Sequence, residues 1–224
     1  MTKHFSLCSY CGNKSENTEG GIISDPVDYL RSTVGKKKDS YKVVESKDCT
    51  WSTYYNMDEF RKEENNCTLT ALTNVMGCFK NIGYNQIPDG KELYDLIEKR
   101  AKKLGYKSSK GLSVTKNNNL VIDTWRKGMD YPDGKGKNDY LWTKKTLISQ
   151  IKKNRSYMFS LATGQYSDHT VAVLGYEVYK NTRTEKEYTF LKVADGWSYG
   201  LRYMSLSESY IGCQTTIVPP SKVE

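Results

Sequence analysis

The chain has 224 residues, of which 37% are hydrophobic and 27% are charged. This balance is typical of a globular protein with a real core, and it excludes a disordered or collagen-like chain. The net charge of +8 raises the question of a nucleic-acid or anionic partner. The basic residues are spread over several segments without interleaved aromatic residues, so we expect solvated basic faces and no specific nucleic-acid binding.

Residues 1–50 are polar and are interrupted by glycines, a proline and a lysine run. This composition predicts an N-terminal arm or pro-segment, followed by one domain over residues 51–224. No window approaches the roughly 18 consecutive apolar residues of a membrane helix, so no membrane span is expected. Cys8 and Cys11 supply only half of a zinc-binding pattern, and we expect neither a metal nor an organic cofactor.

Apolar residues recur at intervals of three and four from Cys67 to Phe79, which predicts a helix with one buried face. Asn65 and Asn66 are good N-cap residues, so Cys67 falls in the first turn of that helix. Further helices are expected over residues 93–104, which Gly105 ends, over residues 120–127 and over residues 143–153.

The pattern changes after residue 153, where runs of β-branched and aromatic residues alternate with turn residues. These runs predict strands over residues 157–161, 170–179, 188–193, 201–206 and 214–218, with a hairpin tip at 181–186. Helices followed by strands indicate an α+β fold in which the helices pack against an antiparallel sheet.

The chain has two histidines, and because His4 lies in the polar terminus, imidazole chemistry falls to His169. His169 opens a strongly apolar strand. Cys67 is its natural complement, since the N-terminus of a helix favours a thiolate. Asp195 ends the next strand of the same hairpin, so the antiparallel register brings it close to His169.

These residues resemble the papain-like cysteine peptidases. The segment Asp-His-Thr-Val-Ala-Val-Leu-Gly-Tyr that contains His169 resembles the histidine strand of the family, and Asp195-Gly196-Trp197 resembles its Asn-Ser-Trp element. Asn66-Cys67-Thr68 resembles the nucleophile at the head of the central helix. The resemblance spans about residues 51–218. The separation of 102 residues between the cysteine and the histidine is short, and with Asp as third member it resembles the compact bacterial branch, which includes bacteriocin-leader (C39-like) peptidases.

The resemblance implies a papain-like fold, with helices first, the nucleophile at the start of a central helix, and a C-terminal antiparallel sheet. It also implies a triad in which Cys67 and His169 form a thiolate–imidazolium pair, the sulfur attacks a peptide carbonyl, and water resolves the thioester. Asp195 would orient the imidazole, and Trp197 would cover their hydrogen bond.

One departure from the family concerns the oxyanion hole. The family carries a glutamine six residues before the nucleophile, whereas position 61 of this chain is Arg. We expect the side-chain amide of Asn65 or Asn66, beside the main-chain N–H of Cys67, to supply the missing donor, or a glutamine to arrive from elsewhere in the chain.

Two alternative functions stay open at the level of sequence. Another thiol acyl-transfer enzyme, such as a transglutaminase-like protein or a cell-wall amidase, would use the same Cys, His and Asp roles. A binding protein that keeps the fold without turnover is the second alternative. For the peptidase the expected partner is a peptide or protein substrate, and a monomer is favoured.

The resemblance also bears on location and processing. The bacterial relatives are secreted, so an extracellular or cell-surface location is expected, and one or two disulfides among Cys8, Cys11, Cys49 and Cys213 would suit it. Leader-processing relatives cut after a double glycine. The pair Gly20-Gly21 therefore raises the hypothesis of a self-cleaved pro-segment.

Overall fold

A computed structural model describes residues 22–61 and 64–221. The helices of this part are α1 (Pro26–Thr33), α2 (Met57–Phe60), α3 (Cys67–Asn81), α4 (Gly90–Lys103), α5 (Asn117–Asp123) and α6 (Lys144–Lys152). A 3-10 turn (Val114–Lys116) precedes α5, and a π turn (Thr124–Gly128) follows it. The strands are β1 (Tyr41–Asp48), β2 (Lys135–Asp139), β3 (Tyr157–Leu161), β4 (His169–Asn181), β5 (Glu187–Ala194), β6 (Arg202–Ser205) and β7 (Gly212–Val218).

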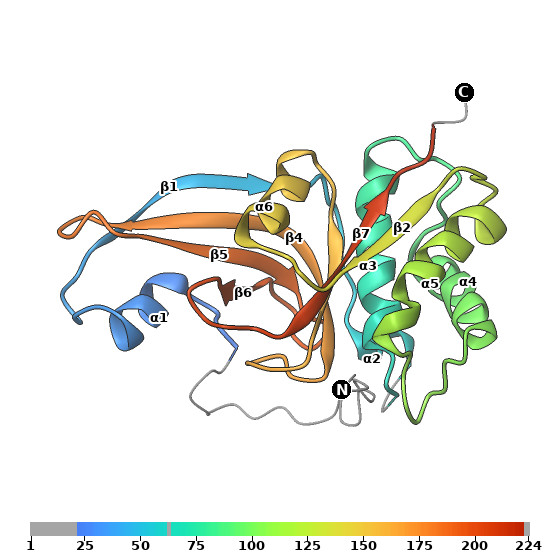
Figure 1. Ribbon diagram of the computed structural model, residues 1–224, viewed down its shortest axis with the longest axis horizontal. Helices are drawn as coiled ribbons and strands as arrows, with labels where there is room; N and C mark the ends of the chain where they lie inside the picture. The colour runs from blue at the N-terminus through green and yellow to red at the C-terminus, as the bar shows by residue number, and fades with distance from the viewer. Residues whose placement is uncertain (1–21, 62–63, 222–224) are drawn as a thin grey trace.

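The strands form one antiparallel sheet in the order β2-β7-β3-β4-β5-β6. The long strand β4 pairs with β3 over its first half and with β1 over its second half, where Tyr41 lies opposite Asn181. Figure 1 shows α2 to α5 gathered at one end of this sheet, while β1, β4 and β5 extend away from them. The mixed helix and antiparallel-sheet class predicted from the sequence is confirmed.

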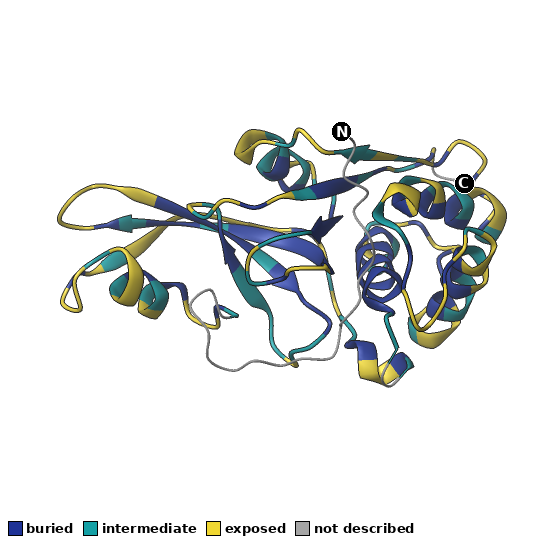
Figure 2. Cartoon of the chain, turned by 60° about the horizontal axis from the view of Figure 1, so that its bottom comes forward, coloured by how far each residue is buried: buried dark blue, intermediate teal, exposed yellow. Residues whose placement is uncertain are grey.

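The central helix α3 is buried on nearly all sides, between the sheet and α4 (Figure 2). Its apolar residues Leu69, Leu72 and Val75 are fully buried, and each such side chain contributes about 1.5–3 kcal/mol to stability. Its threonines are buried as well, and the Thr73 hydroxyl donates to the Leu69 carbonyl at 2.9 Å, which satisfies that polar group inside the helix. The helix begins at Cys67, as predicted.

The segment that the sequence predicted as a polar arm, residues 1–50, contributes to the sheet. Its described part, from residue 22, contains α1 and β1, and Leu30 of α1 is buried in a small second core with Phe190. Strand β1 is held by its main-chain pairing with β4, while its side chains are mostly exposed. This explains why alternation of apolar residues does not reveal it. The Gly20-Gly21 pair, Cys8 and Cys11 lie outside the described residues.

The short helix α2 was not predicted from the sequence, and neither was strand β2. This strand lies in a stretch rich in turn residues, and it pairs with β7 from Lys135 opposite Val218 to Asp139 opposite Gln214. None of the helices in the described ranges is long and apolar enough to cross a membrane.

Candidate functional site

Cys67 and His169 line one pocket, at the junction between the start of α3 and the sheet. The other residues of its wall come from α3, β3, β4 and β7 and from the segments around β2 and α5. They are Thr68, Leu112, Val114, Tyr140, Ser160, Leu161, Ala162, Asp168, Thr170, Gly212 and Cys213. The fold therefore brings together the thiol and the imidazole that the sequence singled out, although 102 residues separate them in the chain.

The thiol of Cys67 lies at the first residue of α3 and is 4% exposed. Burial raises the pKa of this thiol, while hydrogen bonds from Thr170 and Thr68 act in the opposite direction. The net effect is a raised pKa of the Cys67 thiol. The stabilisation of a thiolate that we expected at a helix N-terminus is therefore outweighed by desolvation, and the resting state is the neutral thiol.

His169 is the first residue of β4 and is 3% exposed. Its Nε2 lies 2.6 Å from the main-chain carbonyl oxygen of Asp195. A carbonyl can only accept, so Nε2 carries the proton and Nδ1 of the neutral ring is the basic nitrogen. Burial lowers the pKa of His169 to about 4, against the smaller opposing effect of Asp195. The imidazole is therefore neutral near pH 7.

Asp195 reaches His169 as the hairpin register predicted, since Ala194 pairs with Ala172. The imidazole, however, donates its hydrogen bond to the main-chain carbonyl of Asp195. The Asp195 carboxylate accepts from the main-chain N–H groups of Trp197 and Ser198 and from the hydroxyls of Ser198 and Tyr166. Its observed role is to hold the turn that follows β5, and this turn sets the position of the carbonyl.

Two aromatic rings cover the imidazole. The ring of Trp197 stacks on His169, with centroids 3.9 Å apart and planes inclined by 23°. The ring of Tyr166 lies 6.0 Å away on the same imidazole. These rings keep water from the bond between Nε2 and the Asp195 carbonyl, which accounts for the lowered pKa of His169.

Asn65 and Asn66, the expected oxyanion donors, do not contribute to the lining of the pocket. The side-chain amide of Asn65 donates to the Ser108 carbonyl at 3.1 Å. The amide of Asn66 donates to the carbonyls of Met57 at 3.1 Å and Arg61 at 3.5 Å. Both amides therefore anchor the loop that leads to Cys67. Of the two oxyanion-hole donors expected here, an asparagine side chain and the main-chain N–H of Cys67, the main-chain N–H at the start of α3 remains.

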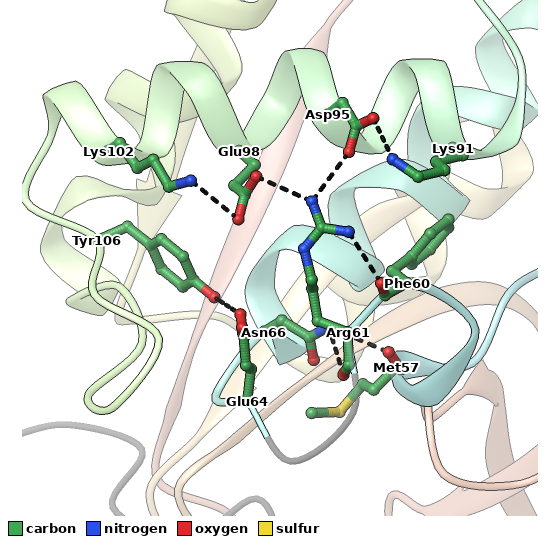
Figure 3. A network of polar contacts seen from close by, with 10 residues as sticks. All are labelled: Met57, Phe60, Arg61, Glu64, Asn66, Lys91, Asp95, Glu98, Lys102 and Tyr106. Carbon is green, nitrogen blue, oxygen red and sulfur yellow. Dashed lines mark hydrogen bonds and ion pairs between the residues drawn. The ribbon is translucent and has the colours of Figure 1, made fainter.

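Arg61, six residues before Cys67, joins the same loop to α4 (Figure 3). Its guanidinium lies 3.3 Å from the Asp95 carboxylate and 3.4 Å from that of Glu98, which is largely buried. It also lies 5.7 Å from the centre of the Tyr94 ring. Arg61 is absent from the pocket wall, so this residue fixes the loop and does not face the thiol.

Two polar features of the pocket were missed by the sequence reasoning. A line of hydroxyls from Ser160, Thr170 and Thr68 lies beneath Cys67, and the buried amide of Asn117 donates into it. A second thiol, Cys213, faces the same pocket. The only available signal was register: Ser160 lies opposite both Thr170 and Cys213, so strand pairing places the three on one face.

Cys49 and Cys213, which the sequence allowed in disulfides, are free thiols, as is Cys78. Within residues 22–61 and 64–221, no group of three or more His, Cys, Asp or Glu side chains is arranged to hold a metal ion. No protein-family model matches the chain, and no curated protein has a significantly similar sequence.

Proposed function

We propose that this protein is a cysteine peptidase of papain-like architecture that uses Cys67 as nucleophile and His169 as general base and acid. The observation that carries the proposal is the pocket itself, whose wall contains both a helix-terminal thiol and an imidazole of fixed tautomer. The apolar wall formed by Leu112, Val114 and Leu161 suits an apolar side chain of a peptide or protein substrate.

The chemical steps follow from the neutral resting states of the two groups. Nδ1 of His169 accepts the thiol proton as the Cys67 sulfur attacks the peptide carbonyl, so the ion pair forms during the reaction instead of preceding it. The imidazolium then protonates the leaving amine, and a thioester remains. Water, deprotonated by His169, attacks the thioester and releases the acid and the free thiol. The Asp195 carbonyl stabilises the imidazolium in both steps.

A binding protein without turnover is the second candidate, because burial disfavours both the thiolate and the imidazolium. An amidase or a transglutaminase would share the proposed chemistry and differ in its substrates. Product analysis separates them, since a transglutaminase joins an amine to glutamine whereas a peptidase cuts the chain.

The first experiment measures alkylation of Cys67 by iodoacetamide as a function of pH, read at each cysteine by mass spectrometry, in the native protein and in His169→Asn. We expect labelling of Cys67 in the native protein to be at least about tenfold faster than in the variant near pH 7. Cys213→Ser is the matched control, because this second thiol lines the same pocket.

Equal labelling of Cys67 with and without His169 would favour the binding protein. Activated labelling would justify a peptide-library search with Cys67→Ser as the inactive control. An extracellular or cell-surface location belongs to the same proposal, and fractionation of the producing cells tests it.

A further inference from the structure

We propose that Asn117 is a positioning residue that acts through a chain of three hydroxyls, aligning them so that a hydroxyl proton points at the sulfur of Cys67 and stabilises its thiolate. The inference rests on the proposed function in taking Cys67 as the nucleophile. The thiol itself reports the effect, so no substrate is needed to test it.

The chain of contacts is continuous and buried. The Asn117 side-chain amide donates to the Ser160 hydroxyl at 3.0 Å. The Ser160 and Thr170 hydroxyls lie 2.9 Å apart, and those of Thr170 and Thr68 lie 3.2 Å apart. Thr170 and Thr68 line the pocket wall beside Cys67, and hydrogen bonds from the main chain and the side chain of both residues act to lower the pKa of its thiol. The four polar side chains that lead to the sulfur thus come from α5, β3, β4 and α3.

The amide fixes the direction of the first bond in this chain and favours one direction for the next two. An amide N–H can only donate, so the Ser160 oxygen accepts from Asn117, and its own O–H can then donate to Thr170. In that arrangement the Thr170 O–H donates to Thr68, and the Thr68 O–H is left to donate to Cys67. A chain of hydroxyls that starts from a fixed donor is polarised along its whole length, and it ends with a proton facing the sulfur.

The burial of Asn117 supports a role beyond packing. Its side chain is 0% exposed, and its Oδ1 has no hydrogen-bond partner among the described residues. A buried polar atom without a partner is unfavourable, and an apolar residue at this position would avoid that cost. The useful part of this amide is therefore its N–H donor, which bonds to Ser160.

Other titratable groups also lie around the Cys67 sulfur, and the experiment has to keep them constant. The pocket wall brings Asp168, His169, Tyr140 and Cys213 close to Cys67. Tyr106 lies near it as well, since the thiolate of Cys67 contributes to the raised pKa of that phenol. The test therefore compares variants in which all of these groups are kept.

The experiment follows the pH midpoint of Cys67 labelling in Thr170→Val, which removes the middle hydroxyl of the chain at nearly constant volume. We expect the midpoint to rise by about one pH unit, which slows labelling about tenfold near neutral pH. Thr73→Val is the matched control. It also removes a buried hydroxyl, and its partner is the Leu69 carbonyl instead of the chain.

Asn117→Asp tests transmission along the chain, because a carboxylate accepts from Ser160 and reverses every bond. We expect the midpoint to rise here too, whereas Asn119→Asp, an exposed change in the same helix, leaves it unchanged. In the Thr170→Val background, Asn117→Asp should have no further effect. If Asn117→Asp does not fold, Ser160→Ala interrupts the same chain.

Two results would overturn the proposal: a Thr170→Val midpoint equal to that of Thr73→Val, or an effect of Asn117→Asp that persists undiminished without the Thr170 hydroxyl, which would mean a through-space charge effect. Failure of the proposed function is distinct from both. In that case no peptide is hydrolysed by the native protein, while the labelling midpoints still shift.

Discussion

A main-chain carbonyl fixes the tautomer of the His169 imidazole. Fixing the tautomer and holding the turn, which one carboxylate could do alone, are therefore done by two different groups of Asp195. The carbonyl of Asp195 selects the proton position at Nε2, while its carboxylate holds the turn through Trp197 and Ser198. A substitution that keeps the turn should therefore keep the tautomer, because every residue has a carbonyl.

Asp195→Asn is the direct test at the residue scale. Its Oδ1 still accepts from the two main-chain N–H groups, so we expect His169-dependent labelling of Cys67 to fall by no more than about tenfold. Where a carboxylate bonds directly to the histidine, the corresponding loss of activity is on the order of 10⁴. A loss of that size in labelling by iodoacetamide would mean that the Asp195 carboxylate itself acts on the imidazole.

At the scale of elements, the start of α3 is held from the side of α4. Arg61 bridges the loop before Cys67 to Asp95 and Glu98, and Lys102 contacts the second oxygen of Glu98 at 3.2 Å (Figure 3). Because Glu98 is largely buried, its carboxylate is stabilised mainly by these partners. The position of the nucleophile is thus coupled to an ion-pair network on a neighbouring helix.

Arg61→Ala should lower the free energy of unfolding by about 1–3 kcal/mol, because it leaves the Glu98 carboxylate with Lys102 alone. Urea denaturation followed by circular dichroism measures this change. Lys91→Ala is the control: it removes the exposed ion pair with Asp95, for which we expect less than about 0.5 kcal/mol. Equal effects of the two variants would show that the buried part of the network contributes nothing special.

At the scale of the whole molecule, the buried imidazole links folding to pH. Burial lowers the pKa of His169 from its ordinary value of 6.5 to about 4, so the unfolded chain binds a proton in this range that the folded protein excludes. The contribution of His169 to stability is complete above pH 6.5 and is lost as the pH falls toward 4.

We therefore expect the native protein to lose up to about 3 kcal/mol more than His169→Asn between pH 7 and pH 4, since the variant has no imidazole to protonate at this position. Urea denaturation of both proteins at several pH values gives the difference, in which the common contribution of the carboxylates cancels. Parallel pH dependence in the two proteins would contradict a neutral buried imidazole.

The sequence predicted the helices and strands whose side chains are buried and periodic, and it missed the short helices α1 and α2 and two strands whose side chains are exposed or only partly buried. The helix from Cys67 and the strand over residues 157–161 were predicted because their side chains repeat the geometry of a packed face. Strand β1 and strand β2 pair through their backbones while exposing many polar side chains, so no side-chain pattern reveals them.

The candidate site also has features that the sequence predicts and features that it does not. The proximity of Asp195 to His169 follows from hairpin register, which sequence can supply. The use of a carbonyl in place of a carboxylate, and of the Asn66 amide to hold a loop, depends on side-chain rotamers in three dimensions. The same holds for the amide of Asn117, whose partner in β3 lies 43 residues away.

The pocket is completed only late in synthesis, because the residues of its wall lie between positions 67 and 213 of the chain. During synthesis Cys67 is made 102 residues before His169, and Cys213 on β7 is added later still. Until the sheet closes, the nascent polypeptide carries an ordinary cysteine with no imidazole beside it. Any reactivity of the pair thus arises only after His169 has been made, and a chain that terminates before His169 lacks it altogether.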